Sequence, residues 1–365
     1  MAAAVLPRIS CAGRIDSVLG MLGGSAMLID AGPQMRWLCG FNGSAGWLLA
    51  SGHGNFLFVD GRYTEQSREQ VADSGVNADV IHVSDHAALF PTIAKHCDGQ
   101  DVVIDGGAVD VATFRKLANA LGREPKPVED PTAKLRRSKS DAEVARIERA
   151  SQITDAALAE VLELDWRRFT ERELASRLEI ALRAAGADRE AFHTIVASGP
   201  NGSRPHHEPG ERRITDGDSV IVDIGAMIDG YHSDMTRTFF IGQPDGFLLD
   251  AYGVVEAAQE AGVRACVAGG TLAGVDAACR AVLAEAKLDH LFVTGTGHGI
   301  GLQIHEEPFI GKAATGTLVS ADVITVEPGI YCEGVGGIRI EDTVSLDPGG
   351  PRRLTLTSKD TSCPR

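Results

Sequence analysis

The sequence predicts a two-domain protein, with an α/β domain over residues 1–132 and an α+β domain over residues 133–365. In the first part, short apolar segments typical of strands alternate with helix-like segments, as in an α/β domain with a mixed sheet. Three prolines then fall within residues 123–131, where we expect a linker, because proline lacks a backbone donor and holds the preceding residue extended. Beyond it, a pair of helices and a block of strands occur twice, which favours an internally duplicated α+β domain.

The elements of the first domain follow from local composition. Its strand candidates are short, apolar and rich in β-branched residues, whereas its helix candidates are longer and mix apolar with charged residues. The expected strands are 25–30, 46–51, 55–60, 79–83 and 101–107. The expected helices are 64–75, 86–97 and 109–122.

The second domain opens with two helices whose starts are marked by capping boxes. In each box a Ser or Thr is followed three residues later by Glu, as in Ser140 with Glu143 and Thr170 with Glu173. Gly186 is placed to end the second of these helices. The expected helices are 140–163, 169–186, 248–270 and 271–288, and the expected strands lie within 219–242, 323–328 and 336–346.

Net charge, cysteine spacing and hydropathy argue against several classes of protein. A formal net charge of −15 argues against a nucleic-acid surface and against an acidic membrane face. The 7 cysteines are spread without a C-x-x-C pair, so neither a disulfide framework nor a structural zinc site is indicated. The N-terminal residues do not resemble a signal peptide and no long apolar stretch occurs, so we expect a cytoplasmic protein with reduced thiols.

Two aspartates stand inside apolar strands, where an ionised carboxylate is costly unless something pairs it. Asp229-Gly230 is a strong hairpin signal, and pairing outward from it places Asp234 opposite Gly225 and Asp223 opposite Thr236. Both carboxylates then project from one face, as diagonal neighbours about 7 Å apart. Two alternatives need no ligand, since Asp234 could pair with a nearby arginine, Arg237, and Asp223 could cap a turn.

Three later residues favour a shared cation. His298 lies in a glycine run, Glu327 ends an apolar strand, and Glu341 lies inside another. Each is weak evidence alone, because a single histidine beside glycines is more often structural. Together with the two aspartates they make five buried ligands, four of them carboxylates, which suits a pair of hard or borderline divalent metals and lacks the thiolates of a closed zinc site.

These motifs resemble those of the Xaa-Pro peptidases, the prolidase and aminopeptidase P branch of the pita-bread metallopeptidases. The resemblance rests on the two aspartates eleven residues apart, then on GHGIG, EPGIY and RIEDT. It extends over the whole chain, because RWLCGFNGSAGWLLA and LFVDGRYTEQ look like the creatinase-type N-terminal domain. It therefore implies an α/β creatinase-like N-terminal domain followed by an α+β pita-bread catalytic domain.

The resemblance also implies roles for the five ligands. Asp223 would chelate one metal, His298 and Glu327 would hold the other, and Asp234 and Glu341 would bridge both. The two ions, manganese first, with cobalt, zinc or iron as alternatives, would share a water of lowered pKa that attacks the carbonyl before proline. Glu327 would also carry the proton to the leaving nitrogen.

Four more residues acquire roles by the same resemblance. His206, or less favourably its neighbour His207, would touch the substrate, and His305 would bind the scissile region or stabilise the oxyanion. Arg339 would orient substrate or a ligand, and Tyr331 would lie near the same pocket. Without the resemblance, a solvated loop histidine, a core histidine and a surface ion pair would be the ordinary interpretations of His206, His305 and Arg339.

Other interpretations stand beside this one. A metal-free creatinase-like hydrolase or binding module on the same fold would typically have lost a ligand, and all five are present. A nucleotide-binding protein using GTGHGIG as a phosphate loop fits neither common glycine spacing. Methionine aminopeptidase shares the ligands in general terms but lacks this N-terminal domain. Thr294 replaces a histidine carried by many relatives, which bears on substrate contact rather than on metal binding.

The expected activity is hydrolysis of the bond between an N-terminal residue and proline in Xaa-Pro peptides. Whether the protein is a dipeptidase or an aminopeptidase is left open, because the two differ in whether the far side of the proline pocket is open. A homodimer is expected by analogy with the group alone.

Overall fold

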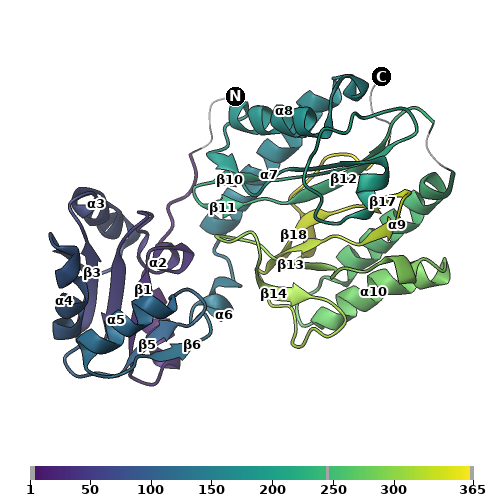
Figure 1. Cartoon of the computed structure of the whole chain (residues 1–365). Coiled ribbons are helices and arrows are strands. Elements are labelled where there is room, and N and C mark those ends of the chain that lie inside the picture. The colour runs from purple at the N-terminus through teal and green to yellow at the C-terminus, as the bar shows by residue number, and fades with distance from the viewer. Residues whose placement is uncertain (1–4, 244–245, 362–365) are drawn as a thin grey trace. The chain divides into compact units, whose positions relative to one another are not determined.

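The computed structural model describes residues 5–243 and 246–361. The chain divides into two compact units, one formed by Arg8–Arg136 and the other by Met1–Pro7 with Arg137–Arg365. Figure 1 shows the elements of both, and each unit is described by itself below.

A six-stranded mixed sheet forms the centre of the Arg8–Arg136 unit, with strand order β4-β3-β2-β1-β5-β6. Strands β1 and β5, β5 and β6, and β3 and β4 pair in parallel, and β2 runs antiparallel to both of its neighbours. The strands are β1 (Ala26–Asp30), β2 (Trp47–Ser51), β3 (Gly54–Val59), β4 (Asp79–His82), β5 (Val102–Asp105) and β6 (Lys126–Val128). The predicted mixed α/β sheet is confirmed.

Helices cover both faces of this sheet (Figure 1). One face packs Leu28, Leu49 and Phe58 against Ile93 and Leu117 of α4 and α5 in an apolar core, and α1, α2 and α3 contact the sheet as well. The helices are α1 (Arg14–Met21), α2 (Pro33–Cys39), α3 (Thr64–Ser74), the 3-10 turn η1 (His86–Ala88), α4 (Leu89–His96), α5 (Val111–Leu121) and α6 (Ala133–Arg136).

The proline-rich segment 123–131 is not only a linker, and this part of the prediction is wrong. Lys126–Val128 form β6 at the edge of the sheet, where the missing N–H of Pro127 can face away from the single neighbouring strand. Helices α1 and α2 were not among the predicted elements. The second of these carries recognisable signals, since Pro33 opens it and Gly40 closes it with a φ of 77°.

The second unit alternates helix pairs and strands, as predicted. Its helices are α7 (Asp141–Leu162), η2 (Trp166–Arg168), α8 (Glu171–Ala184), η3 (Gly199–Ser203), α9 (Gly246–Ala265), α10 (Leu272–Glu285) and η4 (Asp289–Leu291). Its first strands are β7 (Arg189–Glu190), β8 (Ile195–Ser198), β9 (Ser219–Ile224), β10 (Ala226–Ile228), β11 (Tyr231–His232) and β12 (Met235–Phe240). The later strands are β13 (Gly297–Gly299), β14 (Glu306–Ile310), β15 (Val323–Val326), β16 (Gly329–Cys332), β17 (Gly336–Arg339), β18 (Asp342–Asp347) and β19 (Gly350–Arg353).

Two apolar cores hold this unit together, one for each helix pair. Helices α7 and α8 pack on the sheet of β12, β9 and β8, with Trp166 edge-on to Phe239 at 5.1 Å between ring centroids. Helices α9 and α10 pack on the sheet of β14, β13, β15, β18 and β19 and on β17. Figure 1 shows the two helix pairs on opposite sides of the strands.

The predicted hairpin register is confirmed. Ile228 pairs with Tyr231 and Asp223 pairs with Thr236, so one register runs through both short sheets. Asp229 and Gly230 form the turn with φ values of 46° and 74°, the left-handed region that a two-residue hairpin loop requires.

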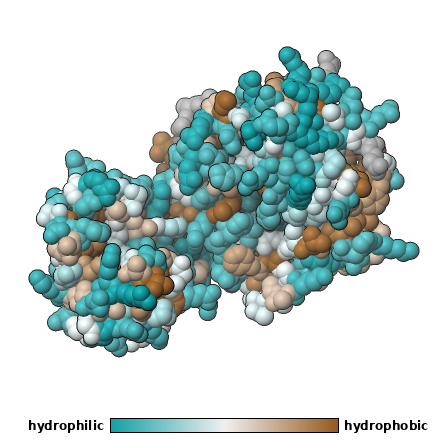
Figure 2. Space-filling model, viewed as in Figure 1, coloured by the Kyte–Doolittle hydropathy of each residue, from teal (hydrophilic) through white to brown (hydrophobic). Residues whose placement is uncertain are grey.

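The surface is largely polar. Figure 2 shows hydrophilic residues over most of the visible face, with scattered apolar ones between them. Within residues 5–243 and 246–361, no helix is long and apolar enough to cross a membrane. No disulfide joins any two cysteines among the described residues, and Cys363 lies outside them.

Candidate metal centre

The nine residues predicted for the site all line one cavity of the second unit, with a volume of about 550 Å³. The five predicted ligands come from five separate segments of the chain. Asp223 lies on β9, Asp234 between β11 and β12, His298 on β13, Glu327 after β15, and Glu341 between β17 and β18. Strands on both helix-covered halves therefore contribute to the same cluster.

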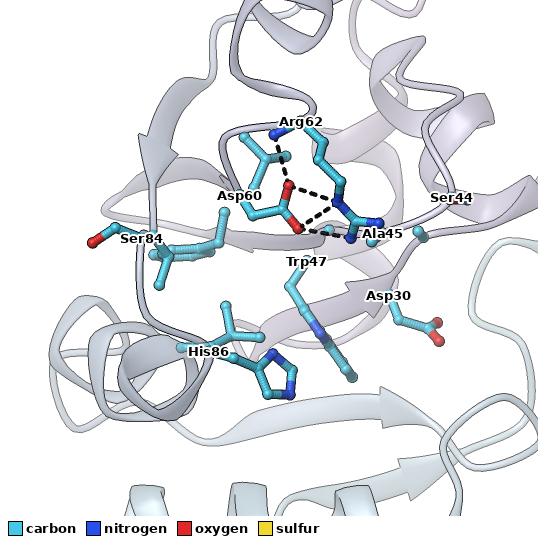
Figure 3. A pocket seen from close by; sticks show the side chains of 14 residues that line it. Asp30, Ser44, Ala45, Trp47, Asp60, Arg62, Ser84 and His86 are labelled. Atoms are coloured by element: carbon cyan, nitrogen blue, oxygen red, sulfur yellow. Dashed lines mark hydrogen bonds and ion pairs between the residues drawn. The ribbon is translucent and has the colours of Figure 1, made fainter.

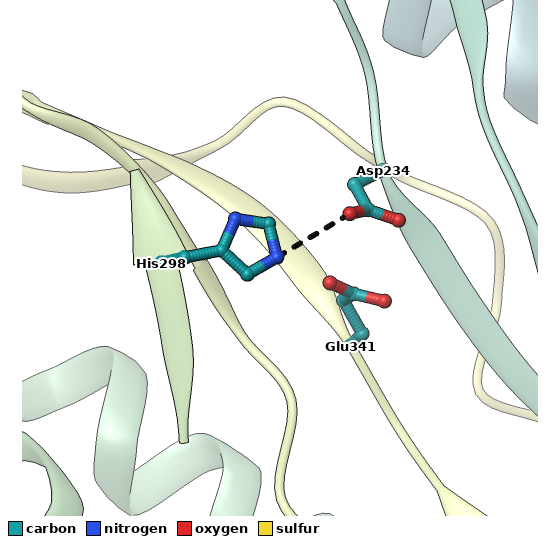
Figure 4. A group of neighbouring side chains, drawn as sticks. All are labelled: Asp234, His298 and Glu341. Atoms are coloured by element: carbon teal, nitrogen blue, oxygen red, sulfur yellow. Dashed lines mark ion pairs between the residues drawn. The ribbon is translucent and has the colours of Figure 1, made fainter. Parts of the chain in front are cut away.

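The tightest part of the cluster contains Asp234, His298 and Glu341, whose ligand atoms all lie within 4.8 Å of one another (Figure 4). His298 Nε2 is 3.6 Å from Asp234 Oδ2 and 3.3 Å from Glu327 Oε1. The figure shows the imidazole and the two carboxylates turned toward a common point, each from a different segment of backbone.

Burial and mutual repulsion disfavour the ionised form of these carboxylates. Burial raises the pKa of Asp234 well above its usual range, and the charges of Glu341, Asp223 and Glu327 raise it further. Burial also raises the pKa of Glu341 well above its usual range, and the charges of Glu327 and Asp223 raise it further. For Glu327, burial also acts to raise the pKa, but the hydrogen bond and charge of His298, together with the charge of Arg339 and the hydrogen bond from Thr325, outweigh it and lower the value.

The donor set fits divalent metal ions. Asp223 Oδ1 and Glu341 Oε1 are buried oxygens without a hydrogen-bond partner among the described residues. An unsatisfied buried acceptor is costly, and a cation between such oxygens would satisfy them and cancel the repulsion between the carboxylates. Four carboxylates and one imidazole are the oxygen-rich ligands that suit ions such as manganese.

Arg339 holds one edge of the cluster in place. Its guanidinium donates to Asp223 Oδ2 at 2.7 Å, to the Tyr331 hydroxyl at 3.0 Å, to Thr236 Oγ1 at 3.1 Å and to the carbonyl of Pro205 at 3.1 Å. Thr236 in turn donates to Glu341 Oε2 at 2.7 Å. Arg339 is therefore placed to orient a candidate ligand, and these contacts occupy most of its donors.

The alternative pairing of Asp234 with Arg237 does not occur. Arg237 is buried and donates instead to Asp342 Oδ1 at 2.8 Å and to the carbonyls of Glu341 and Thr357. Asp234 thus has no arginine partner of its own within the described chain. This leaves its carboxylate facing the cavity.

The structure separates the two adjacent histidines of the loop after η3. His206 lines the cavity, whereas His207 Nε2 donates to Glu171 Oε2 at 2.8 Å. Glu171 is fully buried at the start of α8 and also accepts from the backbone and hydroxyl of Ser198, from the Asn201 amide at 3.0 Å and from the Gly210 N–H. This carboxylate fastens the loop that presents His206.

His305 and Tyr331 also face the cavity. The His305 ring lies edge-on to that of His298, with centroids 4.3 Å apart. Burial lowers the pKa of His305, and the nearby charge of His298 lowers it further. The hydroxyl of Thr294, a residue lining the same cavity, is buried without a hydrogen-bond partner among the described residues.

Sequence reasoning missed the apolar wall of the cavity and the support of its loop. Phe192, Ile304 and Phe309 line the cavity beside His193, and Phe309 is 54% exposed. Nothing in their local pattern distinguishes them from core residues. Glu171 has no predicted role, and its signal in the sequence is its position directly after the Thr170 cap.

A cluster of four carboxylates and the His298 imidazole, on the wall of a cavity that His206 and His305 also line, defines the class of protein as a metal-dependent hydrolase. Comparison of the sequence with known protein families identifies the family within this class. Residues 145–348 match metallopeptidase family M24, and residues 14–138 match the creatinase/prolidase N-terminal domain. The chain belongs to metallopeptidase family M24, whose members use divalent metal ions.

Named relatives of the chain are similar along nearly its full length. An Xaa-Pro dipeptidase of Pyrococcus horikoshii is 32% identical over 92% of this chain and 93% of its own. The solved structure of an Xaa-Pro dipeptidase from Bacillus anthracis has a TM-score of 0.90 at 32% identity, covering 95% of this chain and 97% of the other. An X-Pro aminopeptidase from Thermotoga maritima has a TM-score of 0.85 at 31% identity, with the same coverage.

These comparisons confirm the predicted family and fold. The chain has a creatinase-type N-terminal domain and a pita-bread catalytic domain, and it is a metallopeptidase. The roles assigned to single residues stay predictions.

Proposed function

We propose that the protein hydrolyses the peptide bond between an N-terminal residue and proline in Xaa-Pro peptides. The observation that carries this proposal is the cluster of four carboxylates and one histidine, with two unpartnered oxygens, on the wall of a cavity of about 550 Å³. A dipeptide fits within a cavity of this size. The family match and the printed names of the relatives support proline as the residue after the cleaved bond.

Asp223, Asp234, His298, Glu327 and Glu341 would hold two divalent ions, with manganese proposed first because the donors are mostly oxygen. When bound, such ions supply a water of lowered pKa and polarise a carbonyl oxygen. The unpartnered oxygens of Asp223 and Glu341 support this assignment.

The protein's own side chains have complementary tasks. Hydrolysis adds the hydroxyl of one water to the carbonyl carbon and a proton to the proline nitrogen. Glu327, whose Oε1 lies 3.3 Å from His298 Nε2, is the proposed carrier of that proton. His206 and His305 line the cavity and would contact the scissile region, where an N–H can donate to the developing oxyanion. Arg339 would act by holding Asp223 and the loop carbonyl of Pro205.

Two further features are proposed on the resemblance to the family. These are assembly into a homodimer and a cytoplasmic location. Neither is needed for the chemistry at the cluster.

A turnover assay on metal-reconstituted protein tests the proposal. It compares an Xaa-Pro dipeptide with an Xaa-Pro-Xaa tripeptide, with and without chelator, beside an Asp234→Ala control. Cleavage of the dipeptide alone, abolished by chelator and by Asp234→Ala, identifies a dipeptidase, whereas cleavage of the tripeptide identifies an aminopeptidase. No cleavage of either peptide, together with a protein that retains no metal, would refute the proposal in favour of a metal-free relative on the same fold.

A further inference from the structure

A second cavity lies in the Arg8–Arg136 unit and has no part in the chemistry proposed above. Its volume is about 440 Å³, and all of its lining comes from this unit. Polar groups come from Asp30, the pair Asp60 and Arg62, Ser84 and His86. Figure 3 shows the Asp60–Arg62 pair, Asp30 and His86 arranged around the side chain of Trp47.

The cavity occupies the position in the sheet where α/β domains bind ligands. Asp30 ends β1, Asp60 follows β3, and Ser84 and His86 follow β4. These three strands point the same way, because β2 is antiparallel to both β1 and β3, and β4 is parallel to β3. Crevices outside the carboxyl ends of such strands are the usual ligand sites of open α/β sheets.

An aromatic wall stands beside the Asp30 carboxylate. Asp30 pairs with Trp47 across β1 and β2, so their side chains project from the same face as neighbours about 5 Å apart at Cβ. Trp47 in turn pairs with Phe58, and its ring is fixed edge-on to Phe90 at 5.5 Å. A carboxylate next to an indole face is an environment that attracts a cation.

The charges around the cavity do not balance. Arg62 already has an acidic partner, because its Nε and Nη2 donate to the Asp60 carboxylate at 2.8 to 3.2 Å. No arginine, lysine or histidine within the described ranges pairs with Asp30, although burial raises its pKa and the charge of Asp105 raises it further. Of the two carboxylates in the lining, Asp60 therefore has a basic partner, whereas Asp30, at a partly buried position, has none among the described residues.

We propose that this cavity binds a small molecule carrying a primary ammonium group, which pairs with Asp30 against the indole ring of Trp47. All of the lining belongs to the Arg8–Arg136 unit, and the proposal does not rest on the peptidase reaction. Its occupant is defined by charge, so it should be a cation of a few carbon atoms rather than an anion or a neutral alcohol of the same size.

The test uses three probes of equal size and different charge, namely butylammonium, butanol and butyrate. Full-length protein labelled with ¹⁵N at tryptophan gives at most 3 indole signals, and a Trp47→Phe variant assigns the one from Trp47. Butylammonium is expected to shift the Trp47 signal in a saturable manner, while butanol and butyrate leave it in place. Asp30→Asn is expected to weaken butylammonium binding about tenfold.

Two further variants provide a control outside the cavity and a second test within it. Asp79→Asn removes an exposed carboxylate on β4 outside the cavity and should bind butylammonium as the wild type does. If Asp30→Asn does not fold, Ser84→Lys adds a cation to the cavity rim and should weaken binding by repulsion. The proposal is overturned if the Trp47 signal does not saturate with butylammonium, if butanol or butyrate bind equally well, or if the folded cavity variants bind like the wild type.

Discussion

The carboxylate of Glu171 joins helix α8 to the loop that presents His206 to the catalytic cavity. It accepts hydrogen bonds from Ser198, Asn201, His207 and Gly210, which lie on both sides of His206 in the sequence. Arg339 holds the same loop as well, by donating to the carbonyl of Pro205. A residue remote from the metal cluster is therefore placed to determine where a substrate-contacting histidine lies.

The Glu171→Gln variant should lower kcat/KM by roughly 10- to 100-fold, because a displacement of about 1 Å at a catalytic group has effects of this size. The amide NH2 would replace one of the two oxygens, and so turn a donor toward the N–H of either Ser198 or Gly210 and loosen the loop. If Glu171 acts through His206, Glu171→Gln and His206→Ala should be far from additive in a double-mutant cycle measured by steady-state kinetics.

A matched control is available two residues further along the same helix. Glu173 belongs to the capping box of the same helix and accepts from the Thr170 N–H at 2.8 Å, without touching the loop. Glu173→Gln should leave kcat/KM near the wild-type value. Equal losses in the two glutamine variants, or additive losses with His206→Ala, would contradict the positioning role.

Glu171 should also make stability depend on pH. Burial acts to raise its pKa, but the hydrogen bonds from Asn201, Ser198 and His207 together outweigh burial and lower the value. A carboxyl with a lowered pKa in the folded state stabilises the fold above its ordinary pKa, and this contribution is lost as the pH falls through the folded value. Urea unfolding should therefore show a gap between wild type and Glu171→Gln that is large at pH 7 and smaller below about pH 4. A gap that widens on acidification would contradict this account.

Among single residues, the sequence could identify those whose chemistry is unusual for their surroundings. Asp223, Asp234 and Glu341 were recognisable because carboxylates rarely occur within apolar strands. The resemblance favours His206 over His207, but the residues alone do not separate them, because the difference depends on which of the two histidines Glu171 holds.

At the scale of elements, the capping box at the start of α7 contributes measurable stability. Glu143 Oε2 accepts from the N–H and the hydroxyl of Ser140 at 2.8 Å, and Glu143 Oε1 accepts from the Tyr231 hydroxyl at 2.8 Å. Ser140→Ala should lower the free energy of unfolding by about 1 kcal/mol. Ser138→Ala, at an exposed serine just before the cap, should change it by less than about 0.5 kcal/mol in the same denaturant series. Equal effects would show that the box contributes nothing.

Elements were predictable where local chemistry defines them. The two capping boxes and the Asp229-Gly230 turn fixed helix starts and a strand register that the structure confirms. Strand β6 was missed because Pro127 argues against a strand, and only its place at the sheet edge makes it acceptable. The cavity wall of Phe192, Ile304 and Phe309 is defined by tertiary packing, which local patterns do not encode.

At the scale of the whole molecule, the acidic cluster connects the two cores of the catalytic unit. Asp223 and Asp234 lie on or directly beside the strands that pack on α7 and α8, whereas His298, Glu327 and Glu341 lie on or directly beside those that pack on α9 and α10. Without a cation, their buried carboxylates repel each other across the junction of the two halves. Metal binding should therefore stabilise the folded unit as well as serve the chemistry.

Thermal unfolding of wild type and Asp234→Asn, each with chelator and with Mn²⁺, tests the central claim most directly. For the wild type, Mn²⁺ at about 100 times its Kd should add about 2.7 kcal/mol of stability and raise Tm. In chelator, Asp234→Asn should melt at or above the wild-type temperature, because it removes one repelling charge, and Mn²⁺ should raise its Tm much less. A wild-type Tm that does not respond to Mn²⁺, or an Asp234→Asn variant that responds as fully as the wild type, would contradict the account of a metal centre at this cluster.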